Sequence, residues 1–296
     1  NSTLTLPSHN TMLDRRATFW AMYIPPLLWL GAFFLVPLLL MAAFSFRPNM
    51  QGNLMQPWEP SLRHYENLFS GGSYWGLLWT SVFMALIVAV SATVLAYPVA
   101  YFLAMRAGRK AGIYLVLLLV PFWTSYLLRV MAWKIMLGSD GVINSFLSYV
   151  GLVDAPLTFL LYNRFSVVLT LIYVWIPFVA LPILAALQRI DGSLLEAASD
   201  LGASPAARFW RVTLPLSAPG AIAGFFMVFI PTVGEYVTPL LVGGSRGSMY
   251  GNIIQDFFTK AANWPLGSAL SMVMLVGTLL LVGLAVRLVD VRRLVQ

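Results

Sequence analysis

Residues able to do acid–base, nucleophilic or metal chemistry are scarce in this chain. It contains no cysteine, and its only histidines, His9 and His64, lie in polar stretches. No HExxH, GxSxG or Walker A pattern occurs, and histidines and carboxylates do not cluster at ligand spacing. The sequence therefore predicts no catalytic residue, no metal site and no cofactor, which argues against an enzyme.

Glu235 is the best candidate to bind a charged solute, because it lies in a long apolar stretch where a charge is costly. It follows the helix-loosening residues PTVG at 231–234 and precedes Tyr236. A carboxylate beside an aromatic ring suits an amine cation, through charge pairing and a cation–π attraction of roughly 0.5–2 kcal/mol. Further candidates for a solute pathway are Trp123, Tyr126, Arg129, Tyr173 and Trp175.

Each of these residues also has a plainer interpretation. If Glu235 paired with Arg129 or Lys134, its role would be purely structural, as an ion pair that holds two helices together. The presence of these two basic residues also argues against a pathway that simply attracts cations. A single aromatic ring more often faces lipid or packs against a neighbouring helix. Both interpretations of Glu235 stay open from the sequence alone.

The elements that must position these residues are membrane-spanning helices. The chain has 296 residues, of which 59% are hydrophobic and 10% charged, whereas an ordinary soluble domain has about 25% charged residues. The mean hydropathy is +0.81. The net charge of +7 comes from basic residues at the ends of apolar runs, so nucleic acid is not a predicted partner.

Six stretches are apolar enough to cross a lipid bilayer, which requires about 20 mostly apolar residues per helix. The first is too long for a cleaved signal peptide, and no small-residue cleavage site follows it. Prolines inside the spans are tolerated in lipid and are expected to bend them. The sequence thus predicts an all-α membrane protein with six transmembrane helices, at residues 19–46, 74–105, 112–136, 165–187, 218–241 and 266–289.

The distribution of lysine and arginine predicts the orientation of these spans, because short cytoplasmic loops are enriched in both residues. The strongest indication is the tight turn RAGRK at 106–110. This orientation places both termini, and the connection between spans four and five, in the cytoplasm. We therefore expect a cytoplasmic tail 1–18, a single transmembrane domain 19–289 and a cytoplasmic tail 290–296.

The connection between spans four and five, residues 191–215, has the pattern of two short helices joined by a bend. Asp191 or Ser193 can cap the start of the first helix. Gly202 suits the left-handed position that ends a helix.

A second set of signals follows the glycine. Ser204 can cap a second helix with Pro205 at its first position. Pro215 and Pro219 are expected to break the helical path before span five. Together these signals indicate a hairpin of specified shape, although a plain interfacial loop remains the alternative.

The same residues resemble the EAA motif of bacterial ABC-importer permeases, in which EAA, three residues, glycine, nine residues and I-x-LP follow in order. The chain has Glu196-Ala197-Ala198, then Gly202, then Val212-x-Leu214-Pro215 at the same spacing, and Val212 in place of isoleucine is the one departure. Outside the motif, residues 121–137 (PFWTSYLLRVMAWKIML) and 231–244 (PTVGEYVTPLLVGG) resemble permeases of spermidine/putrescine importers. The resemblance extends over nearly the whole chain from about Ala17.

This resemblance implies a bacterial inner-membrane permease that pairs with a second, related permease. An ATPase dimer would dock from the cytosol, and a periplasmic binding protein would deliver the solute, with polyamines such as spermidine and putrescine as the leading class. The hairpin would be the coupling helix that sits in a groove of the ATPase, where Glu196 would meet a basic group. The residues implied in coupling are Glu196, Ala197, Ala198, Asp200, Gly202, Ala203, Arg208, Leu214 and Pro215.

Two other functions remain open. The same class of transporter would carry a different small solute, such as an amino-acid derivative or an opine, if its binding protein selected one. A self-contained secondary transporter would fit broken helices with charges near the midplane of the bilayer. The hairpin, and six spans without a detectable inverted repeat, favour the permease.

Overall fold

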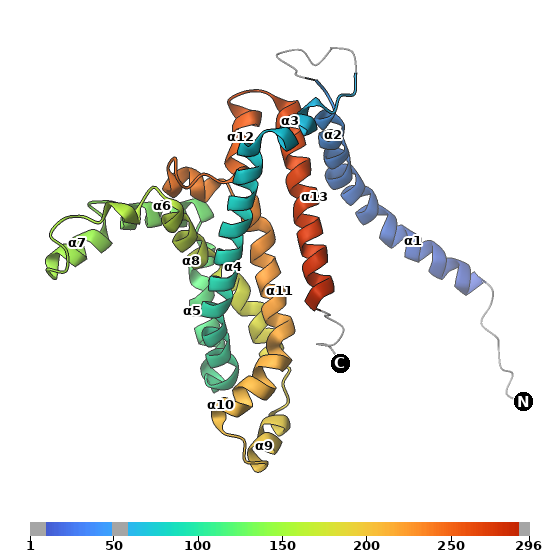
Figure 1. The fold of residues 1–296 in the computed structure, drawn as a ribbon. Coiled ribbons are helices and arrows are strands. Elements are labelled where there is room, and N and C mark those ends of the chain that lie inside the picture. The colour runs from blue at the N-terminus through green and yellow to red at the C-terminus, as the bar shows by residue number, and fades with distance from the viewer. Residues whose placement is uncertain (1–9, 49–58, 290–296) are drawn as a thin grey trace, which may run out of the picture.

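The computed structural model describes residues 10–48 and 59–289, and every regular element in those ranges is helical. The ends of both predicted tails, residues 1–9 with His9 and residues 290–296, lie outside the described residues. The first helix begins within the predicted tail 1–18. The α-helices (Figure 1) are α1 Asn10–Leu30, α2 Val36–Ser45, α3 Arg63–Ser70, α4 Gly72–Met105, α5 Ala111–Leu119, α6 Tyr126–Leu137, α7 Val142–Tyr149, α8 Arg164–Leu187, α9 Gly192–Asp200, α10 Pro205–Arg208, α11 Leu214–Val233, α12 Tyr250–Thr259 and α13 Trp264–Val289.

Short turns of other helix types connect or interrupt these helices. Three are 3₁₀ turns: η2 Gly108–Lys110, η3 Val120–Trp123 and η4 Thr158–Leu160. Three are π-helical: η1 Gly31–Leu35, η5 Phe209–Thr213 and η6 Pro239–Gly243.

The structure confirms the predicted all-helical membrane fold. Within the described residues, five helical stretches are long and apolar enough to cross a bilayer, namely Phe19–Ser45, Ser73–Met105, Arg164–Leu187, Pro205–Val233 and Trp264–Arg287. The predicted third span, 112–136, falls on a pair of helical segments, Gly108–Trp123 and Tyr126–Tyr149, bent by 87° at the break between them. Counted as one broken span, this pair completes the predicted six.

The bend in the third span has a local cause. Pro121 lies in the 3₁₀ turn η3, and Thr124 and Ser125 then adopt extended backbone, with ψ angles of 150° and 140°. The Thr124 hydroxyl donates to the Pro121 carbonyl at 2.6 Å, which satisfies one carbonyl at the broken helix end. As a result α6 and α7 extend sideways from the bundle rather than along it (Figure 1).

Helices α4, α8 and α11 pack against one another and form the core of the bundle. One face of α4 carries small side chains at helical spacing, all completely buried: Ala85, Ala89, Ala92, Ala96 and Ala100. Small side chains let neighbouring helices approach closely, and close packing is a main source of helix association in lipid.

The contact between α8 and α11 requires glycine at two positions. A β-carbon at Gly220 would lie 2.5 Å from the Ala186 Cβ and 2.5 Å from the Pro182 carbonyl oxygen. A β-carbon at Gly224 would lie 2.9 Å from the Val179 side chain. Both distances are well below a normal carbon contact of about 3.5–4.0 Å, so the two helices lie closer together than any larger residue permits.

The first span stands apart from this core. Its apolar window, within Phe19–Ser45, has no buried residue. Its second half, α2, packs on α13, whereas α1 diverges from the bundle (Figure 1). This span therefore leaves most of its apolar surface uncovered within the chain.

Candidate functional site

The first helix of the 191–215 hairpin begins as the sequence predicts. The Asp191 side chain accepts a hydrogen bond from the Ser193 backbone N–H at 3.0 Å and caps α9. This bond to the charged form lowers the pKa of the Asp191 carboxyl below its ordinary value, so the cap stays ionised well into the acidic range. Helix α9 has no buried residue, and together with α10 it forms one end of the molecule (Figure 1).

The bend of the hairpin is a Schellman motif at Gly202. Gly202 has φ of +80°, as predicted. Its N–H donates to the Ser199 carbonyl at 2.8 Å, and the Ala203 N–H donates to the Ala198 carbonyl at 3.0 Å. These two bonds satisfy carbonyls that the end of a helix would otherwise leave free, so the sequence fully specifies the turn.

The second helix also starts as predicted but does not end as predicted. The Ser204 hydroxyl accepts from the Ala207 N–H at 3.2 Å, with Pro205 at the first helical position. The predicted break at Pro215 and Pro219 is wrong, because Pro205–Val233 is one continuous helical stretch. The reason is the π-helical turn η5, which widens the helix around the carbonyl four residues before Pro215, where the ring would otherwise clash.

Glu196 lies exposed on α9 and forms no ion pair with any residue that the structure describes. Arg208 instead folds back, and its guanidinium donates to the Ser199 hydroxyl at 2.7 Å, which ties α10 to α9. Of the other predicted coupling residues, the exposed ones are Ala197, Asp200, Gly202 and Pro215, and the half-buried ones are Ala198, Ala203 and Leu214.

Two apolar side chains of the hairpin were missed from the sequence. Leu201, directly before the bend, is 88% exposed, and Trp210, on η5, is 65% exposed. Both are large apolar side chains that the chain itself leaves uncovered. The signal was present in the sequence, as apolar residues outside the six apolar stretches.

The predicted fifth span, 218–241, is broken near the opposite end of the bundle. Helix α11 ends at Val233, and the Glu235 carboxylate accepts from the backbone N–H groups of Val237 and Thr238, at 2.9 and 3.1 Å. Glu235 thus caps the helical segment that continues into η6. The loosening expected from PTVG is confirmed.

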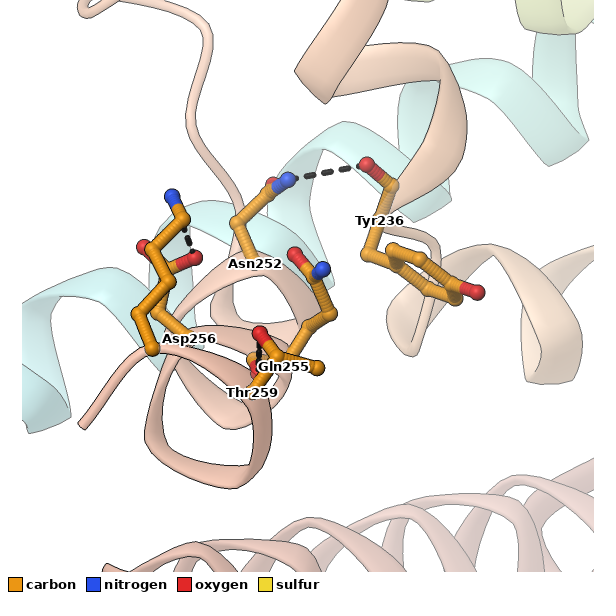
Figure 2. A network of polar contacts seen from close by, with 6 residues as sticks. Tyr236, Asn252, Gln255, Asp256 and Thr259 are labelled. Atoms are coloured by element: carbon orange, nitrogen blue, oxygen red, sulfur yellow. Dashed lines mark hydrogen bonds and ion pairs between the residues drawn. The ribbon is translucent and has the colours of Figure 1, made fainter. Parts of the chain in front are cut away.

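Helix α12 stabilises this break from the side. The Asn252 side chain donates to the Tyr236 carbonyl at 2.8 Å, while the Tyr236 ring points away from Asn252 (Figure 2). A β-carbon at Gly251 would lie 2.5 Å from the Gly234 carbonyl oxygen, so only glycine allows this approach. No local pattern predicts these partners, because they come from a separate helix.

The alternative in which Glu235 pairs with Arg129 or Lys134 is not seen, since Glu235 has no ion pair among the described residues. The Arg129 guanidinium lies 4.5 Å from the centre of the Phe122 ring, and the Lys134 ammonium lies 5.8 Å from that of Tyr162. The Arg129 Nε is buried without a hydrogen-bond partner in the described part of the chain. Arg129 therefore forms no direct ion pair with any residue that the structure describes.

The structure brings only one of the predicted aromatic residues to Glu235. The Tyr126 hydroxyl lies 2.5 Å from the Thr238 hydroxyl and close to the Glu235 carboxylate. The other rings are engaged elsewhere: Tyr173 with Trp133 at 5.3 Å and Trp175 with Phe178 at 5.4 Å. Trp123 is 80% exposed at the bend of the third span.

Comparisons with known proteins agree with this architecture. Residues 96–294 match the family described as binding-protein-dependent transport system inner membrane component. The chain is 36% identical over 243 residues to the spermidine/putrescine transport system permease protein PotB of Haemophilus influenzae, covering 82% of this chain and 84% of that protein. It is 31% identical over 259 residues to the inner membrane ABC transporter permease protein YdcU of Escherichia coli, covering 84% and 82%.

A solved structure shares the fold. A chain of a bacterial ABC transporter involved in the import of the acidic polysaccharide alginate superimposes with a TM-score of 0.74 at 18% identity, covering 94% of this chain and 96% of that chain. The protein belongs to the family of binding-protein-dependent transport system inner membrane components. It is a multi-pass permease subunit of an ABC importer in the bacterial inner membrane, and its part in the system is transport rather than catalysis.

Proposed function

We propose that this permease imports its solute with ATP hydrolysed by a separate ATPase dimer, which binds the α9–α10 hairpin from the cytoplasm. The hairpin carries this proposal. It is capped at both helix starts, closed by a Schellman motif and held across by Arg208, so it is rigid enough to transmit a displacement. The basic turn at 106–110 lies at the same end of the bundle, which supports a cytoplasmic position (Figure 1).

The exposed surface of the hairpin suits a groove on a soluble protein. Leu201 and Trp210 offer apolar anchors, and the exposed acids Glu196 and Asp200 lie one turn apart on α9. Glu196 has no ion-pair partner among the described residues and is available to a basic side chain of the ATPase. Glu196, Ala197 and Asp200 are the exposed residues of α9 that would make this contact.

Charge reversal at Glu196 tests the docking. In the Glu196→Lys variant we expect the ATPase to be lost on purification, while the permease still inserts into the membrane. Glu66→Lys is the matched control, because Glu66 is also an exposed acid in the first part of a short helix, α3, at the opposite end of the bundle. Unchanged recovery of the ATPase with Glu196→Lys would refute the proposed contact.

A second, related permease would complete the membrane part of the transporter. The uncovered first span supports this, because a long helix with no buried residue in its apolar window gains packing only from another protein or from lipid. A periplasmic binding protein would deliver the solute to the end that carries α3 and α12 (Figure 1). Purification should therefore recover two different permeases with two copies of the ATPase.

The proposed solute is a small organic cation of the polyamine class. Sequence identity of 35–36% to spermidine/putrescine permeases over most of the chain supports this class of solute. Glu235 also provides a carboxylate beside the Tyr126 hydroxyl at the broken span. Uptake of labelled spermidine and putrescine by the complete transporter in liposomes tests it. Import by this chain alone under an ion gradient would indicate a secondary transporter instead.

Arg129 favours a second candidate solute, one that carries an acid group as well as an amine. Its guanidinium lies over Phe122 with no acidic partner among the described side chains, so an anionic group of the solute would neutralise it. Competition of labelled spermidine uptake by amino-acid derivatives separates the two. Arg129→Gln should reduce import only of a solute that bears the acid group.

A further inference from the structure

The junction between the hairpin and α11 is attached to α4 by an aromatic contact. Phe209, the first residue of η5, packs between two tyrosine rings of α4, Tyr97 and Tyr101. Both ring pairs are edge-to-face with centroids 5.8 Å apart, at interplanar angles of 88° and 81°. This geometry is the favoured one for aromatic pairs, so Phe209 is held in a defined position on α4.

A buried chain of hydroxyl groups makes a second attachment. The Ser217 hydroxyl donates to the Thr213 carbonyl at 2.8 Å, and its oxygen lies 2.6 Å from the Tyr97 hydroxyl. Because the single proton of Ser217 is used on Thr213, Tyr97 must donate to Ser217. Ser217 is completely buried and Tyr97 is 9% exposed, so water does not compete for these bonds.

The two attachments join points where both helices can flex. Thr213 ends the π-helical turn η5, and turns of this kind interrupt the regular hydrogen-bond ladder of a helix. Tyr97 directly precedes Pro98, which removes one backbone bond inside α4. A firm link at this level makes the two weakened segments move together.

We propose that Tyr97, Ser217 and Phe209 are positioning residues for energy coupling, which carry the displacement of the hairpin to α4. The proposal rests on the ATPase-docking function of the hairpin. A push on α9 and α10 reaches η5 first, and the hydroxyl chain and the Phe209 contact convert it into a shift of α4 instead of a local bend. Without the link, η5 absorbs the motion.

The test uses the complete transporter in liposomes, with solute import and ATP hydrolysis measured together. Tyr97→Phe and Ser217→Ala each delete the hydroxyl link while keeping the ring or nearly the same volume. We expect the solute imported per ATP hydrolysed to fall about fivefold or more, the range of typical coupling free energies. The ATPase should still co-purify. The double variant should behave like either single variant, because all three lack the same link.

Two controls separate coupling from a general structural effect. Tyr101→Phe keeps the ring that contacts Phe209 and leaves the Tyr97–Ser217 bond in place, so import per ATP should match the wild type. Thr232→Ala removes another buried hydroxyl of α11, one that bonds only within its own helix. Normal import per ATP in both Tyr97→Phe and Ser217→Ala would overturn the proposal.

Failure of the docking function would look different. It would appear as normal ATPase recovery with Glu196→Lys, whereas failure of the link alone leaves the Glu196→Lys effect intact. If Tyr97→Phe does not assemble, Ser217→Ala gives the same readout from the other side of the bond. A loss of import in Tyr101→Phe equal to that in Tyr97→Phe would also overturn the assignment of the link.

Discussion

The close contact between α8 and α11 makes a quantitative prediction about Gly220. In Gly220→Ala, the new methyl group would lie 2.5 Å from both the Ala186 Cβ and the Pro182 carbonyl oxygen. Normal contact requires about 3.5–4.0 Å, so the helices must separate by about 1 Å. The carbonyl is backbone and cannot rotate away, which places the cost near the upper end of the usual overpacking range, about 3 kcal/mol.

A competing effect reduces this cost without reversing it. Alanine is a better helix former than glycine by about 1 kcal/mol, so the net loss of stability in Gly220→Ala should be about 2 kcal/mol. Gly277→Ala isolates the competing effect, because a β-carbon at Gly277 in α13 would meet no atom within 4 Å. That variant should be as stable as the wild type or up to about 1 kcal/mol more stable.

The comparison is made by heating the detergent-purified permease and measuring the folded fraction that remains. Gly220→Ala should unfold at a clearly lower temperature than the wild type, and Gly277→Ala at the same temperature or higher. If the two variants unfolded together, the tight α8–α11 contact would not contribute to stability as the geometry requires.

Three further predictions follow from local geometry. Glu235→Ala should destabilise the permease by about 1 kcal/mol, because the helix cap is lost. Glu235→Gln keeps an accepting oxygen, so the transporter should still assemble while uptake of a cationic solute weakens. Normal uptake kinetics in Glu235→Gln would remove Glu235 from the solute pathway. Gly202→Ala should weaken ATPase co-purification because its φ of +80° costs an L-residue about 1–2 kcal/mol, with Gly202→Asn milder; equal recovery for both variants and the wild type would contradict this. Burial lowers the pKa of His64, whose ring bonds to the Arg47 carbonyl, so the neutral ring stabilises α3 above pH 6.5 and that stabilisation is lost as pH falls below it. The protection factors of the α3 amides, which correct hydrogen exchange for its intrinsic dependence on pH, should fall over that range and stay constant in His64→Gln.

The hairpin was predictable from sequence because its interactions are local. The Asp191 cap, the Gly202 turn and the Ser204 cap each join residues no more than five positions apart. Every one of them depends on a residue type with a strong intrinsic preference for its position. The resemblance to the EAA motif added a function to a shape that the residues already specify.

The surroundings of Glu235 were not predictable in the same way. A loosening of the helix was expected from PTVG at 231–234, but the groups that stabilise the break come from elsewhere: Asn252 lies 16 residues beyond Tyr236, and Tyr126 lies 112 residues before Thr238. Considered without those contacts, an acid in an apolar stretch needs a cationic partner. Backbone N–H groups exposed by a broken helix satisfy it instead.

Proline bends the chain at one position and leaves a helix continuous at another, because the surrounding backbone differs. Pro121 accompanies a bend of 87° because the following two residues are extended, whereas the helix continues through Pro215 because a π-helical turn precedes it. The ring imposes the same constraint at both positions. Whether the chain bends or widens depends on neighbouring packing, which no local pattern records.

Helix α11 connects the two candidate sites of the molecule. Its first residues hold the hydroxyl link through Ser217, and its last, Val233, precedes the break that Glu235 caps. Twenty residues at 1.5 Å per residue make it about 30 Å long. Gly220 and Gly224 hold this helix close against α8, so that part cannot bend away without losing a tight contact. If the hairpin moves as proposed, a displacement at η5 would either shift α11 along α8 or strain that contact, and a shift along the helix axis would reach the capped break at Glu235.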